Sequence, residues 1–89
     1  MRIEFRRSFL SDLKGIRDQG LLKRLRDAVQ EIEQAPDLGD IRGLRRLREE
    51  DRYYRARLGD YRIGLVFESD NTVVFVRFLH RKDVYRYFP

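Results

Sequence analysis

A chain of 89 residues has room for one domain with a thin core, and because it has no cysteine and one histidine, we expect no disulfide, no metal site and no cofactor. No apolar run is long enough to span a membrane and the N-terminus lacks a signal peptide's apolar stretch, so a cytoplasmic protein without membrane contact is expected. The net charge of +5 lies entirely in residues 41–89 and comes mostly from arginine. This predicts a nucleic acid or an acidic protein as the partner. The alternative is a basic surface that is simply exposed to solvent.

The first half of the chain predicts one strand and two helices. "MRIEF" at residues 1–5 alternates in polarity as a strand does. Ser8 is an N-cap candidate for a helix that runs to Gly20, and apolar residues at helical spacing predict a second helix over residues 21–36, ended by Pro36. The two helices are expected to be antiparallel neighbours.

The second half predicts strands. Residues 37–52 indicate a charged connection with a short strand at Leu44 to Leu47, and from Tyr53 onward polarity alternates with a period of two. The dipeptides Gly59-Asp60 and Asp70-Asn71 divide this part into three strands. The prediction is a single α+β domain over residues 1–89 with the order β-α-α-β-β-β, an antiparallel sheet covered on one face by two antiparallel helices, and a short C-terminal helical turn.

A two-residue loop at Gly59-Asp60 places arginines opposite one another. It pairs Arg57 with Arg62 and Arg55 with Gly64, and these residues face away from the helices. Like charges opposite one another are unfavourable, which suggests that an anion lies between them. Gly64 has no side chain, so a ligand could approach the sheet there.

The register of the last strand extends this cationic face. A two-residue Asp70-Asn71 loop puts one set of residues with the helices: Val74, Val76 and Phe78. The other set lies with the arginines: Val73, Phe75, Arg77 and Leu79. Arg81 projects on the same side. A slip of one residue in either loop would scatter the cluster.

Arginine binds phosphate but does not act readily as a base, so catalysis needs another group. His80 is a candidate general acid or base, because the ordinary pKa of histidine suits both roles. Tyr85 could transfer a proton or stack on a nucleobase, and Glu49 or Glu50 could supply a carboxylate as the general base. The alternatives are structural: His80 as a hydrogen-bonded residue at a strand end, and Tyr85 as part of a cap over the core. With these groups, an RNA 2′-hydroxyl could attack its adjacent phosphate without metal.

The run "YYRARLGDYRIGLVFESDNTVVFVRFLHRKDVYRYF", preceded by two helices, resembles the RelE/ParE superfamily of toxins from toxin-antitoxin pairs, and its RelE side more than its ParE side. The resemblance implies a ribosome-dependent endoribonuclease that cuts messenger RNA in the ribosomal A site. It assigns catalytic positions to six residues: Arg55, Arg57, Arg62, His80, Arg81 and Tyr85. Further RNA-binding candidates are Arg45, Arg46, Arg77 and Lys82. Well-studied members carry lysines at the positions of Arg55 and Arg57, which leaves the general base open.

The resemblance also implies partners. These are the ribosome with its messenger RNA and a cognate antitoxin. The antitoxin is expected to wrap the domain with an acidic segment and an amphipathic helix, and operator DNA is contacted only through the antitoxin. Two alternatives remain: a ParE-like inhibitor of DNA gyrase without nuclease activity, and a non-toxic RNA- or ribosome-binding module.

Overall fold

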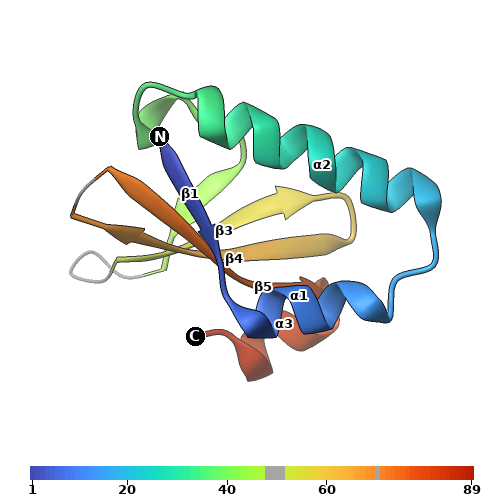
Figure 1. The fold of residues 1–89 in the computed structure, drawn as a ribbon. Coiled ribbons are helices and arrows are strands. Elements are labelled where there is room, and N and C mark those ends of the chain that lie inside the picture. Colours follow the sequence, from blue (N-terminus) through green and yellow to red (C-terminus); the bar gives the residue numbers. More distant parts are fainter. Residues whose placement is uncertain (48–51, 70) are drawn as a thin grey trace.

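A computed structural model describes residues 1–47, 52–69 and 71–89 of the chain, which form one sheet flanked by helices (Figure 1). The sheet has five strands in the order β1-β5-β4-β3-β2. Their bounds are Arg2–Phe5 for β1, Leu44–Arg46 for β2, Tyr53–Leu58 for β3, Tyr61–Glu68 for β4 and Thr72–His80 for β5. The predicted α+β class is confirmed, and the short strand expected near Leu44 is present as β2.

The helices are α1 (Arg7–Lys14), α2 (Gln19–Gln34) and α3 (Arg81–Tyr87), and a 3₁₀ turn, η1, spans Leu38–Asp40. In Figure 1, α2 runs back in the direction opposite to α1. None of the helices in the described ranges combines the length and the hydrophobicity that a membrane span requires.

The first helix is shorter than predicted. It ends at Lys14, with Gly15 as its C-cap, and does not continue to Gly20. Ser8 does not serve as the N-cap, since the helix begins at Arg7 with Arg6 as its N-cap, and the Ser8 hydroxyl donates a hydrogen bond to the Val76 carbonyl at 2.6 Å. The second helix is capped by Asp18, whose carboxylate accepts a hydrogen bond from the Leu21 amide.

Three of the four strand pairs are antiparallel, as predicted, and the fourth is not. β1 lies parallel to β5, with Ile3 opposite Val73. The two helices between β1 and the rest of the sheet provide the long crossover connection that parallel neighbours require.

The β3–β4 hairpin has the predicted register. Arg57 pairs with Arg62, Arg55 with Gly64 and Ala56 with Ile63, around a turn in which Gly59 has a positive φ of 57°. The predicted division of these two strands between the sheet faces is therefore confirmed.

The register of β5 differs from the prediction over residues 73–76. The two-residue loop predicted that Glu68 pairs with Val73, but Glu68 pairs with Thr72, one position away. As a result, Val73 and Phe75 join the core beneath the helices. A β-bulge at Val76 then restores the expected pairs, Gly64 with Arg77 and Ile63 with Phe78. The two shifts compensate each other, so Arg77 and Leu79 keep the predicted face although Val73 and Phe75 do not.

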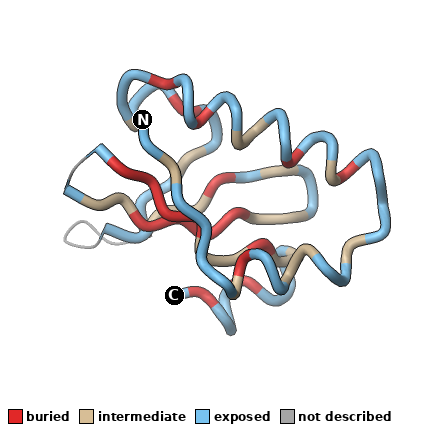
Figure 2. Tube along the Cα trace, viewed as in Figure 1, coloured by how far each residue is buried: buried red, intermediate tan, exposed pale blue. Residues whose placement is uncertain are grey.

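The two faces of the sheet are covered differently. Phe9 of α1 and Leu21, Leu25 and Ile32 of α2 pack on one face with the buried side chains of the strands. The short α3 lies on β4 and β5 through its buried residue Val84 and through Phe88, which directly follows the helix and is also buried. Figure 2 shows the buried positions concentrated on the central strands and the inner side of α2. Part of the sheet face opposite α2 is therefore left for a site.

Candidate active site

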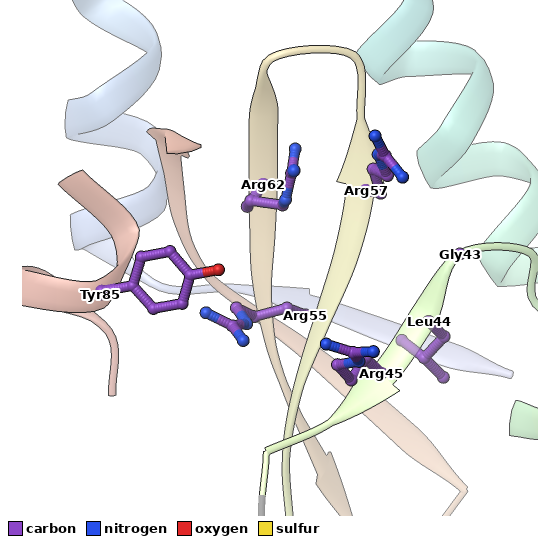
Figure 3. A pocket seen from close by; sticks show the side chains of 7 residues that line it. All are labelled: Gly43, Leu44, Arg45, Arg55, Arg57, Arg62 and Tyr85. Carbon is purple, nitrogen blue, oxygen red and sulfur yellow. The ribbon is translucent and has the colours of Figure 1, made fainter. Parts of the chain in front are cut away.

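A pocket of about 340 Å³ lies on the sheet face opposite α2, between the edge strand β2 and α3 (Figure 3). It is lined by Gly43, Leu44, Arg45, Arg55, Arg57, Arg62 and Tyr85. Five of these seven were candidates from the sequence, and no acidic side chain lines the pocket among the described residues. A pocket with this lining attracts anions.

The arginines are arranged in two opposed pairs. Arg57 faces Arg62 across β3 and β4, and Arg45 faces Arg55 across β2 and β3. Each pair places like charges in neighbouring strands, which is unfavourable by roughly a few tenths to 1 kcal/mol. Packing alone gives no reason for two such pairs side by side, whereas a phosphate that accepts hydrogen bonds from both members of a pair does.

Tyr85 forms the wall of the pocket on the α3 side, and its hydroxyl points toward the strands in Figure 3. The Arg55 guanidinium carbon lies 4.5 Å from the centre of the Tyr85 ring, a cation–π contact. Tyr85 is nevertheless 74% exposed, so its ring remains accessible to a ligand. The contact joins Arg55 of β3 to Tyr85 of α3 within the pocket lining.

Arg62 is held by the hairpin turn. Its Nη1 atom donates hydrogen bonds to the carbonyl oxygens of Gly59 and Tyr61, each at 2.8 Å. These bonds orient the guanidinium before any ligand binds, and a preorganised donor stabilises developing charge more effectively than a mobile one.

The predicted close approach at Gly64 is made by the chain itself. A Cβ atom at this position would lie 2.8 Å from the ring of Phe88, which is buried against the strand. Gly64 therefore lets the C-terminal segment seat on the sheet. Packing of Phe88 against the strand therefore explains why position 64 is a glycine.

Arg77 keeps the predicted face but binds Asp12 of α1. Its Nε and Nη2 atoms donate to the two carboxylate oxygens of Asp12 at 2.8 and 3.0 Å, and the Phe78 amide donates to the same carboxylate at 2.9 Å. The hydrogen bond that Arg77 donates to Asp12 raises the pKa of the Arg77 guanidinium above its ordinary value. Arg77 thus joins α1 to β5, and it lies outside the pocket lining.

The other candidates also lie outside the pocket lining. Arg46 donates to the Tyr54 hydroxyl at 3.1 Å, on the face that the helices cover. Arg81, at the start of α3, places its Nε 3.9 Å from an Asp60 carboxylate oxygen, and Lys82 is exposed beside it. His80 accepts a hydrogen bond from the Lys82 amide. Glu49 and Glu50 fall outside the described residues.

Sequence reasoning missed three residues that shape this region. Gly43 has a positive φ of 69° and its carbonyl accepts from the Arg57 amide at 3.2 Å, so it brings β2 alongside β3. Leu44 enters the pocket lining as a consequence. Asp12 is 65 residues from Arg77 in the sequence, and no local pattern links the two. Of the three missed residues, only Gly43, the glycine before "LRRL", could have been recognised from the sequence, as a turn residue at the start of β2.

The comparisons with known proteins agree with this fold. Residues 3–85 match the sequence model of a family described as the ParE toxin of the type II toxin-antitoxin system, parDE. The chain therefore belongs to the RelE/ParE superfamily of type II toxins.

Among its relatives, Toxin RelE3 of Methanocaldococcus jannaschii is 36% identical over 90 residues, covering 100% of both proteins. The toxin-antitoxin complex RelB-RelE of Methanococcus jannaschii contains a chain that superimposes with a TM-score of 0.77 at 32% identity, covering 97% of this chain and 99% of that one. A chain of the RelBE2 complex of Mycobacterium tuberculosis superimposes with a TM-score of 0.69 at 26% identity, with 92% of each chain covered.

Proposed function

We propose that this toxin is a metal-independent endoribonuclease that cleaves messenger RNA in the ribosomal A site. The observation that carries the proposal is the pocket with two opposed arginine pairs and Tyr85 at its wall. Five N–H donors on each guanidinium suit the phosphate oxygens of an RNA backbone, and an aromatic ring beside them suits a nucleobase.

The reaction that fits this pocket uses the substrate's own nucleophile. The 2′-hydroxyl oxygen bonds to the adjacent phosphorus, the bond from phosphorus to the 5′-oxygen breaks, and a 2′,3′-cyclic phosphate results. The hydroxyl proton leaves to solvent, and the 5′-oxygen receives a proton, for which the Tyr85 hydroxyl is the acid at the pocket wall. The arginines stabilise the negative charge that develops on the phosphate oxygens.

The pocket contains no group that is an effective base at neutral pH among its described lining residues. Its contribution is therefore positioning and charge stabilisation, which together can supply a large part of the rate enhancement. Positioning of the RNA by the ribosome would complete it, and the proposed place of action is accordingly the cytoplasm.

The proposed protein partner is a cognate antitoxin. An apolar groove of about 340 Å³ lies between α1 and α2, where Leu10 is 49% and Phe5 43% exposed. Such a groove fits the apolar face of an amphipathic helix, and an acidic segment of the same partner would cover the arginine pocket. The similar RelE chains are found in complexes with RelB, which supports this partner class. Contact with operator DNA would be made through the antitoxin.

The test is primer extension on a defined message in a cell-free translation system with the purified protein, with and without ribosomes. Codon-phased cuts that require ribosomes and disappear with the Arg62→Gln variant are expected. A message that stays intact under conditions in which the protein arrests growth in cells would overturn the proposal.

The second candidate is inhibition of DNA gyrase, and it is favoured by the ParE description of the matched family. It predicts DNA damage signalling with intact messenger RNA when the protein is induced. The same induction experiment, read for both outcomes, separates the two functions.

A further inference from the structure

His80 lies at the junction between β5 and α3, where it is the N-cap of the helix. Its backbone is extended, with φ −60° and ψ 148°, and its Nδ1 atom accepts a hydrogen bond from the Lys82 amide at 3.1 Å. An N-cap side chain that accepts from the second helical residue satisfies an amide that has no partner within the helix. Since Nδ1 is the acceptor, the proton of the neutral ring is on Nε2.

The imidazole faces away from the arginine pocket. His80 is paired with Tyr61, and the two rings meet edge to face with centroids 5.4 Å apart and an interplanar angle of 79°. Tyr61 in turn stacks on the core residue Phe78 at 5.0 Å. Because the pocket residue Arg62 follows Tyr61 in the same strand, its side chain lies on the opposite face of the sheet.

The helix that His80 caps carries Tyr85 to the pocket. This helix has seven residues, too few to be stable without support. Three contacts supply that support: the His80 cap, a hydrogen bond from the Arg81 amide to the Asp60 carbonyl at 2.7 Å, and the burial of Val84 and Phe88.

We propose that His80 is a positioning residue, which holds α3 so that Tyr85 meets Arg55, and that it does not exchange a proton with the substrate. The proposal rests on the proposed nuclease function where cleavage is the readout, whereas the capping role can be measured on the protein alone.

Three substitutions separate positioning from proton transfer. His80→Asn retains an acceptor atom bonded to Cγ, where Nδ1 is; His80→Gln moves the acceptor one bond farther; and His80→Ala removes it. A catalytic acid or base would be lost in all three variants. A cap would be lost in the glutamine and alanine variants and restored in the asparagine variant.

The first measurement is amide hydrogen exchange at Lys82 in the folded protein. We expect exchange about fivefold faster in His80→Ala and His80→Gln than in the native chain, and exchange close to the native rate in His80→Asn. Unchanged protection of Lys82 in the alanine variant would overturn the capping role, whether or not the protein cleaves RNA.

The second measurement is ribosome-dependent cleavage by the same proteins. We expect His80→Asn to cleave within about threefold of the native rate, with larger losses for the other two variants. An asparagine variant with native Lys82 protection and cleavage as low as that of the alanine variant would overturn the proposal and return His80 to the reaction. If the native chain itself cleaves nothing, the nuclease function fails while the exchange experiment still decides whether His80 is a cap.

Discussion

The two faces of the sheet follow different physical rules. On the face toward α2, aromatic and aliphatic side chains are buried against one another, and Phe75 has 0% of its surface exposed. On the face with the pocket, arginines stand opposite arginines on three neighbouring strands. Burial accounts for the first face. On the second, Val84 and Phe88 are also buried, but the opposed arginine pairs beside them are unfavourable to folding. The proposed binding of an RNA phosphate would account for the arginine pairs on the second face.

The largest expected effect is on the core face. Phe75→Ala removes a fully buried ring that contacts Phe5 and Phe9, so it should lower the free energy of unfolding by about 3–5 kcal/mol. Urea denaturation followed by circular dichroism measures this loss. A change below 1 kcal/mol would mean that Phe75 is not packed as described.

On the pocket face, substitution should affect activity in preference to stability. Arg62→Gln removes a preorganised cation, so ribosome-dependent cleavage should fall by roughly 10²-fold, as for other lost charge-stabilising donors. The control is Arg17→Gln, which changes an exposed arginine in the connection between α1 and α2. Equal cleavage by both variants would remove the pocket from the mechanism.

Asp12 links the two faces of the sheet, because it belongs to α1, which packs on the core face, and binds Arg77 of β5, which lies on the pocket face. Asp12→Ala leaves the Arg77 guanidinium, with 26% of its side chain exposed, without this partner and should lower the free energy of unfolding by about 1–3 kcal/mol. Thermal unfolding compared with Asp27→Ala, an exposed carboxylate of α2, gives the measurement. Equal melting temperatures would contradict a structural role for the ion pair.

The smallest expected effect is an increase in stability, where the substitutions in the core and at the ion pair are expected to decrease it. Arg57→Thr removes one member of a like-charged pair and introduces a residue that favours strands, so stability should rise by a few tenths to about 1 kcal/mol while cleavage falls. Denaturation at low salt, where repulsion is least screened, is the sensitive measurement. A clear loss of stability would show that Arg57 contributes to packing.

Sequence reasoning predicted the β3–β4 hairpin because the turn at Gly59 fixes every pair that follows from it. It was wrong for Val73, Val74 and Phe75, because "TVVFV" is apolar on both faces and alternation carries no signal there. The parallel pairing of β1 with β5 depends on how the helices cross over, which side-chain patterns do not report.

For the site, sequence reasoning placed Arg55, Arg57, Arg62 and Tyr85 correctly in one region, since strand alternation and the C-terminal position were enough. It did not anticipate the partners of Arg77 and His80, an aspartate on a distant helix and a backbone amide of the following turn. Both contacts depend on three-dimensional placement of groups that a linear pattern leaves unspecified.

The bulge at Val76 has a consequence for how this sheet can change in evolution. Deletion of this one residue would carry either the segment before it or the segment after it to the opposite side of the sheet. In the first case Val73 and Phe75 would leave the core, and in the second Arg77 would lose Asp12. Insertions and deletions in the β4–β5 hairpin should therefore survive selection only as compensating pairs, one in the loop and one at the bulge.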